Sequence, residues 1–153
     1  MKFKIEIWKN FEDGAKPQYI TGFLTLEDAI DSGFALARRR NSGVINIEPA
    51  GKRRGYLSEE RLAGIYPEHL DLESQPRTLE RARGNLVKFK AKLKAERARD
   101  RFVREHGGWA SGLIDRILHD EAIKAAFFAN DFATVEKLLA ETALPVNSGE
   151  NKP

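Results

Sequence analysis

The chain has 153 residues, of which 41% are hydrophobic and 32% charged, with a formal net charge of +3. That length fits one ordinary domain, or a small domain with a helical extension. The absence of cysteine excludes disulfides and thiolate metal sites. No apolar run approaches the roughly 20 residues that a membrane span needs, and residues 1–10 lack the apolar core of a secretion signal. We therefore expect a cytoplasmic protein with no membrane segment.

Residues 1–55 predict a small α/β module with the order β-β-α-β. Polar and apolar side chains alternate strictly over residues 2–8, which is typical of a half-buried strand. Residues 18–24 predict a second strand after a turn, and residues 44–48 predict a third that a proline ends. The predicted helix lies between the second and third strands and would cross a small sheet.

That predicted helix begins after Thr25, which we expect to be its N-cap, with Asp28 three residues on. Apolar residues then recur at helical spacing up to Ala37 and form one face. Gly33 lies on this face, and its lack of a side chain would permit close packing on the sheet.

Residues 56–75 predict a linker that contains a short helix from Ser58 to Ile65. The linker follows a basic loop over residues 49–57, and its second half is irregular and acidic. At the other end of the chain, residues 145–153 are rich in polar residues, Gly and Pro, and we expect a disordered tail there.

Residues 76–106 predict one long helix, although Lys and apolar residues alternate over 88–94 as they would in a strand. The flanking residues are rich in Ala, Leu, Glu and Arg, which favour helix, and β-branched residues are scarce. Pro76 suits a helix start, and Gly107-Gly108 would end the helix.

The long helix carries two apolar faces on different sides. The early face consists of Leu79, Ala82, Leu86, Phe89 and Leu93, and the late face of Ala91, Ala95, Ala98 and Phe102. A helix of this kind is expected to pack against two bodies. We expect the N-terminal sheet on the early face, and the C-terminal helices or a second copy of the chain on the late face.

Residues 109–142 predict two or three short helices, so that residues 76–144 form a helical region. The fold class is therefore α+β: a small β-β-α-β N-terminal module followed by a long basic helix and a C-terminal helical bundle.

Positive charge is concentrated in the long helix. From Arg77 to Glu105 there are eleven Lys or Arg and four acidic residues, so the rest of the chain is net acidic. Five of these cations fall within about 80° of the helix circumference, namely Lys90, Lys94, Arg97, Arg101 and Arg104. The plausible ion pairs within the helix are Asp100 with Arg104 and Glu96 with Arg99.

A stripe of unneutralised cations favours a polyanion as partner, because each phosphate that is neutralised releases counterions. The candidate nucleic-acid-binding residues are Lys88, Lys90, Lys92, Lys94, Arg97, Arg101 and Arg104 on the helix and Lys52, Arg53 and Arg54 in the basic loop. Base reading would need amides or exposed aromatic rings. Since Phe89 and Phe102 have the spacing of packing residues, we expect contacts to the phosphate backbone of DNA or RNA.

Two other interpretations of the basic helix stay open. It is also typical of a solvated, solubilising face. The alternative function is a protein-interaction module that acts on an acidic partner surface. Such a module would be an inhibitor or adaptor, of the kind that a phage or plasmid encodes, and a homodimer is one expected assembly.

Catalytic and metal motifs are not recognisable in the sequence. The three histidines, His69, His106 and His119, lie at no metal-binding spacing. The loop around Gly51-Lys52 lacks the residues of a phosphate-binding loop at the required positions. We therefore expect a protein that is not an enzyme and that has no metal and no cofactor.

Overall fold

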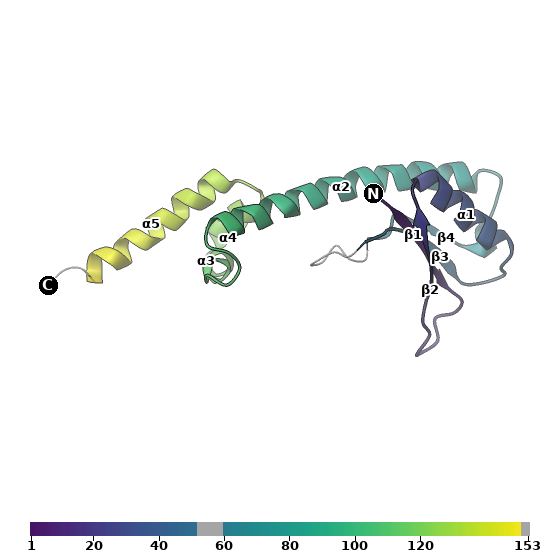
Figure 1. Ribbon diagram of the computed structural model, residues 1–153, viewed down its shortest axis with the longest axis horizontal. Coiled ribbons are helices and arrows are strands. Elements are labelled where there is room, and N and C mark those ends of the chain that lie inside the picture. The colour runs from purple at the N-terminus through teal and green to yellow at the C-terminus, as the bar shows by residue number, and fades with distance from the viewer. Residues whose placement is uncertain (52–59, 151–153) are drawn as a thin grey trace. The chain divides into compact units, whose positions relative to one another are not determined.

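The computed structural model describes residues 1–51 and 60–150, with side chains described to residue 142. Its elements in chain order are β1 (Phe3–Trp8), β2 (Gln18–Phe23), α1 (Leu26–Arg38), β3 (Val44–Pro49), β4 (Ala63–Ile65), the 3-10 helix η1 (Pro67–His69), α2 (Ser74–Glu105), α3 (Leu113–His119), α4 (Glu121–Phe128) and α5 (Phe132–Glu150) (Figure 1). The predicted α+β class is confirmed. None of the helices in these residues is both long and apolar enough to cross a membrane.

The chain divides into two compact units, Met1–Ala91 and Lys92–Pro153. Helix α2 therefore contributes its first part to one unit and its last part to the other. The sequence predicted the domain boundary in the linker before the long helix, but the two units divide within that helix, after Ala91. The helical region was predicted to end at residue 144, and α5 continues to Glu150.

The first unit contains an antiparallel sheet with the strand order β2-β1-β3-β4. Ile5 lies opposite Ile47 in the pairing of β1 with β3, and Ile7 lies opposite Ile45. These side chains point to the same face of the sheet, since alternate residues of a strand share a face. That face is the hydrophobic side, where all four isoleucines are buried.

Helix α1 covers the hydrophobic face of the sheet (Figure 1). Thr25 caps the helix as predicted, because its hydroxyl oxygen accepts a hydrogen bond of 3.1 Å from the Asp28 amide. A Cβ atom at Gly33 would lie 2.8 Å from Cδ1 of Ile65 and 3.1 Å from Cδ1 of Ile47. The predicted close approach of the helix to the sheet at Gly33 is therefore confirmed.

The fourth strand corrects the short helix that we predicted from Ser58 to Ile65. In the described part of that segment, Ala63–Ile65 is the strand β4, which pairs with β3 through Ile45 and Ile65. The alternation of buried Ala63, exposed Gly64 and buried Ile65 has the period of a strand. The open edge of β3 decides the conformation, because the three residues contain a helix-disfavouring glycine and are too few to form a stable helix alone.

Strand β2 is the opposite edge of the sheet. Its residues from Gln18 to Gly22 are all exposed, and none of them carries a charge. The pairing with β1 is irregular between Phe3 and Ile5, opposite Gly22, whose φ is +98°. This is the geometry of a β-bulge, which is common at sheet edges.

The first half of α2 packs on this unit by the early apolar face, as predicted. Ala82 and Phe89 are buried. Asn85 Nδ2 donates a hydrogen bond of 2.9 Å to the carbonyl oxygen of Leu62, beside β4. Arg83 pairs with Glu27 of α1 at 3.1 Å, so polar contacts flank the buried face.

The second unit has its own hydrophobic core, built from the end of α2 and from α3, α4 and α5. Its buried members are Phe102, Val103, Leu113, Ile117, Ile123, Phe127, Val135 and Leu139. The ring of Phe102 stacks on that of Phe132 at a centroid distance of 4.9 Å. Phe102 of the late apolar face therefore packs on the C-terminal helices, which was one of the two predicted alternatives.

Candidate nucleic-acid interface

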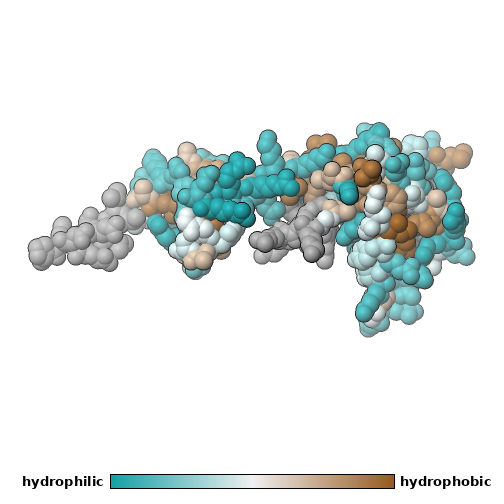
Figure 2. Space-filling model, in the orientation of Figure 1, coloured by the Kyte–Doolittle hydropathy of each residue, from teal (hydrophilic) through white to brown (hydrophobic). Residues whose placement is uncertain are grey.

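Four cations of the second unit share one side of α2. Lys94, Arg97, Arg101 and Arg104 lie within an arc of about 80°, and we call them the basic face. Phe102 and Val103, which are buried in the core of this unit, lie on the other side of the helix. Because the core occupies one side, the basic face is directed to solvent. Hydrophilic residues predominate on the visible surface along the stretch where Figure 1 draws α2 (Figure 2).

The basic face is poorly neutralised by the described residues. Lys94, Arg97 and Arg101 are exposed, and none of them forms an ion pair within the described part of the chain. Arg104 is the exception, since its Nε lies 3.0 Å from Oδ2 of Asp100. This pair was predicted. It leaves the other three cations of the basic face without an ion pair in the described part of the chain.

The other predicted site residues that the structure describes do not all lie in the same unit as the basic face. Lys88 and Lys90 are exposed on α2 but belong to the first unit, and Lys92 is exposed at the start of the second. Lys52, Arg53 and Arg54 lie outside the described residues, so their convergence with the helix stays a prediction. The basic face is the part of the predicted site that one compact unit brings together.

Arg99 points away from the basic face and does not pair with Glu96 as expected. Its Nη1 donates a hydrogen bond of 2.9 Å to Oδ1 of Asn130, and its guanidinium lies over the ring of Phe128, 5.5 Å from the centroid. Asn130 Nδ2 in turn donates to the carbonyl oxygen of Ala95 at 3.1 Å. Arg99 thus joins α2 to the end of α4, where its charge is used within the fold.

An exposed aromatic ring, which is not among the candidate site residues predicted from the sequence, lies beside the basic face. Trp109 is 55% exposed, and its Nε1 donates a hydrogen bond of 2.8 Å to Oδ1 of Asp100. Asp100 is also the partner of Arg104. Phe89 and Phe102, by contrast, are buried packing residues as predicted. A signal was present in the sequence, since Trp109 follows two glycines at the end of a basic helix.

A buried polar cluster occupies the other face of the sheet in the first unit. Oε1 of Glu6 accepts hydrogen bonds from Trp8 Nε1 at 2.6 Å and Asn46 Nδ2 at 3.0 Å. Oε2 of Glu6 accepts one from the Tyr19 hydroxyl at 3.1 Å. Burial acts to raise the pKa of Glu6, but these three hydrogen bonds outweigh it and lower the pKa below its usual value. Every oxygen of this carboxylate is thus engaged within the fold.

Glu48 lies in the same cluster but in a less favourable environment. Burial raises the pKa of Glu48 above its usual value, and the nearby Glu6 carboxylate raises it further. The ammonium of Lys4, 3.6 Å from Oε2 of Glu48, offsets part of this effect. The described residues that surround these two carboxylates bury both of them.

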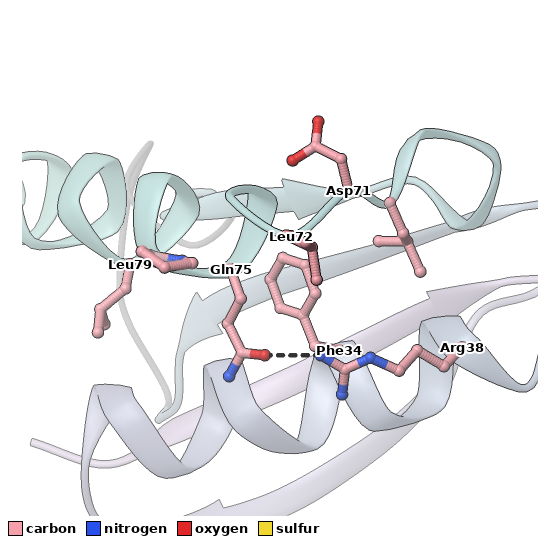
Figure 3. A pocket seen from close by; sticks show the side chains of 8 residues that line it. Phe34, Arg38, Asp71, Leu72, Gln75 and Leu79 are labelled. Atoms are coloured by element: carbon pink, nitrogen blue, oxygen red, sulfur yellow. Dashed lines mark hydrogen bonds between the residues drawn. The ribbon is translucent and has the colours of Figure 1, made fainter.

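A groove of about 720 Å³ lies in the first unit, between the end of α1 and the segment that leads into α2 (Figure 3). Phe34 and Arg38 line one wall, and Asp71 and Gln75 line the other. Arg38 Nη2 donates to Gln75 Oε1 at 2.9 Å, and Gln75 Nε2 donates to Asp31 at 2.6 Å. Because Arg38 and Gln75 are already hydrogen bonded within the protein, the groove has fewer polar groups available to bind a ligand than the basic face has.

The histidines have structural contacts. His106 stacks on Phe102 at a centroid distance of 3.9 Å, and its Nε2 lies 3.0 Å from Oε1 of Glu136. His119 Nδ1 lies 2.6 Å from the carbonyl oxygen of Asp115. Among the side chains described, in residues 1–51 and 60–142, no group of three acidic or histidine residues could hold a metal ion.

Among the described residues, the basic face and Trp109 combine exposed positive charge with an exposed aromatic ring. Compared with protein-family models, with curated protein sequences and with solved structures, the chain matches none.

Proposed function

We propose that the protein is a non-enzymatic accessory or regulatory protein of the cytoplasm that binds nucleic acid through the phosphate backbone. The observation that carries the proposal is the exposure of Lys94, Arg97 and Arg101 on one side of a helix whose other side is buried. These cations have no ionic partner among the described residues. A polyanion would supply the missing negative charge.

The spacing of the basic face suits a linear polyanion better than an isolated anion. Residues three or four apart on a helix lie about 5–6 Å from one another at Cβ, so Lys94, Arg97 and Arg101 present charges in a row. If three or four phosphates are neutralised, a plot of log affinity against log salt concentration has a slope of about −2 to −3.5. Such binding is largely independent of sequence, because phosphate contacts do not read bases.

The proposal is tested by electrophoretic mobility shift with labelled oligonucleotides at low and at moderate salt. A triple variant, Lys94→Glu, Arg97→Glu and Arg101→Glu, should abolish binding. The control is Lys9→Glu, Lys16→Glu and Lys137→Glu, which changes the net charge equally at exposed lysines elsewhere. The control should bind nearly as well as the wild type if the basic face is the site.

Two results would contradict the proposal. One is equal loss of binding in the two triple variants, because the effect would then follow net charge and not the basic face. The other is an absence of nucleic-acid binding at low salt, together with a protein partner that survives nuclease treatment and depends on the same three cations. That second result would support the predicted interaction with an acidic protein surface.

A further inference from the structure

Trp109 is held in an exposed position by contacts at one edge of its ring. The indole N–H donates to Oδ1 of Asp100, while Oδ2 of the same carboxylate forms an ion pair with Arg104, 3.0 Å from its Nε. One carboxylate therefore holds an aromatic ring and a guanidinium side by side. Both groups belong to the second unit, so their proximity is a property of that unit alone.

The loop after α2 brings the ring back to the helix. Gly107 and Gly108 have φ values of +111° and +86°, which L side chains rarely adopt. The Gly108 amide donates 2.8 Å to the carbonyl oxygen of Val103, and the Ser111 hydroxyl donates 2.7 Å to the carbonyl oxygen of Gly108. The turn is thus fixed by its own hydrogen bonds, and it places Trp109 nine residues along the chain from its acceptor.

The faces of the indole ring are not used within the described part of the chain. Trp109 stacks on no other described ring and lies under no described cation. Phe128 is similarly exposed at 53%, but it packs on Phe127 and lies beneath Arg99. Exposed aromatic rings next to cations are the feature by which proteins bind unpaired bases while they hold the phosphates.

Resting on the nucleic-acid binding proposed above, we infer that Trp109 is a stacking platform for an unpaired base, so that the basic face binds single-stranded nucleic acid in preference to duplex. A base stacked on the indole places its phosphate towards Arg104, which Asp100 holds beside the ring. The strand then continues along α2 past Arg101 and Arg97. In duplex, the bases stack on one another and their faces are closed to the indole except at the ends.

The test compares a deoxythymidine oligomer of about twelve nucleotides with a duplex of the same length whose ends are closed by hairpins. Affinities are measured by fluorescence anisotropy of the labelled nucleic acid. Wild type should bind the oligomer at least tenfold more tightly than the duplex. Trp109→Ala should weaken oligomer binding between about 5-fold and 150-fold, the range for loss of one stacked base, and should leave duplex binding unchanged.

Two controls separate stacking from a general disturbance of the fold. Phe128→Ala removes a ring of similar exposure in the same unit and should leave the preference for the oligomer intact. Trp109→Phe keeps an aromatic surface, so its loss of affinity should be smaller than that of Trp109→Ala. The oligomer should quench the tryptophan emission of wild type but not that of Trp109→Phe, in which Trp8 is the remaining tryptophan.

The outcomes distinguish this inference from the proposed function. Equal or tighter binding of duplex, or equal weakening of both ligands by Trp109→Ala, overturns the stacking role and leaves phosphate binding in place. The stacking role is also overturned if Phe128→Ala loses the preference for the oligomer over the duplex. If wild type binds neither ligand at low salt, the proposed function fails, and the stacking role fails with it.

Discussion

Asn46 donates a hydrogen bond of 3.0 Å from Nδ2 to Oε1 of Glu6, across the antiparallel pairing of β3 with β1. The two residues lie directly opposite each other in the register, and both are buried, with 1% and 8% of their surface exposed. A carboxylate in this position depends on its donors, because a buried charge without hydrogen bonds is costly. The contact therefore joins two strands that are far apart in the sequence.

Replacement of Asn46 by alanine should lower the free energy of unfolding by about 1–3 kcal/mol, the cost of leaving a buried partner unsatisfied. Urea denaturation at neutral pH measures the change. Asn10→Ala is the matched control, since Asn10 is exposed and accepts one hydrogen bond of 3.3 Å from the Glu12 amide. It should change stability by less than about 0.5 kcal/mol, and equal effects of the two substitutions would contradict the role given to Asn46.

Glu48 should make stability depend on pH in the direction opposite to that of Glu6. The pKa of Glu48 is raised by burial in the folded state, so the folded chain holds this proton more tightly than the unfolded chain. As pH rises from the ordinary carboxyl pKa of about 4.3 to the raised value, this group lowers the free energy of unfolding. Glu48→Gln should remove that decline and increase stability at neutral pH.

The pKa of Glu6 is lowered, and its contribution therefore has the other sign. Its stabilisation is present above the ordinary carboxyl pKa and is lost as pH falls through the lowered value. Glu6→Gln should thus decrease stability at neutral pH. Chemical denaturation of both variants across the acidic range checks the pair, and the assignment fails if the two substitutions shift stability in the same direction.

Asn130 should be sensitive to substitution for two separable reasons. Its φ of +58° is unusual for a residue with a side chain, and its amide bonds both Ala95 and Arg99. Asn130→Ala loses the hydrogen bonds and increases backbone strain, and we expect a cost of about 2–4 kcal/mol. Asn130→Gly loses the same bonds without the strain, so it should cost about 1 kcal/mol less. Hydrogen exchange in the second half of α2 reports the change, and equal protection in the two variants would show that strain is unimportant.

Arg101 and Arg99 provide a matched pair for the salt dependence of binding. Arg101 lies on the basic face, whereas Arg99 is bonded to Asn130 on another side of the helix. Arg101→Gln should reduce the magnitude of the slope of log affinity against log salt by about 0.7–0.9, which corresponds to one phosphate. Arg99→Gln should leave the slope unchanged. A titration over several salt concentrations measures both, and a smaller slope in Arg99→Gln would place the binding surface elsewhere on α2.

Local patterns were sufficient to predict most of the elements. The alternation over residues 2–8, the cap at Thr25 and the helical composition of residues 76–106 each depend on neighbours in the sequence, and each prediction is confirmed. The two apolar faces of α2 also follow from helical periodicity alone, and each contributes buried residues: Ala82 and Phe89 from the early face and Phe102 from the late face.

Features that depend on distant partners were not predictable in this way. The strand at Ala63–Ile65 forms because β3 offers an unpaired edge, and its three residues carry too little signal by themselves. The contact of Trp109 with Asp100 depends on the direction in which a glycine turn leads the chain. The basic face was predictable as a set of residues, but which cations are used within the fold was not, as Arg99 shows.

The outer edge of β2 is expected to affect the behaviour of the protein at high concentration. Edge strands present unpaired backbone amides and carbonyls, and charged side chains are a common protection against the addition of further strands. From Gln18 to Gly22 no charge provides that protection, and Ile20 is 39% exposed. We therefore expect that sheets from separate molecules can join along this edge at high protein concentration, and Ile20→Lys should extend the concentration range over which the protein stays monodisperse in light scattering.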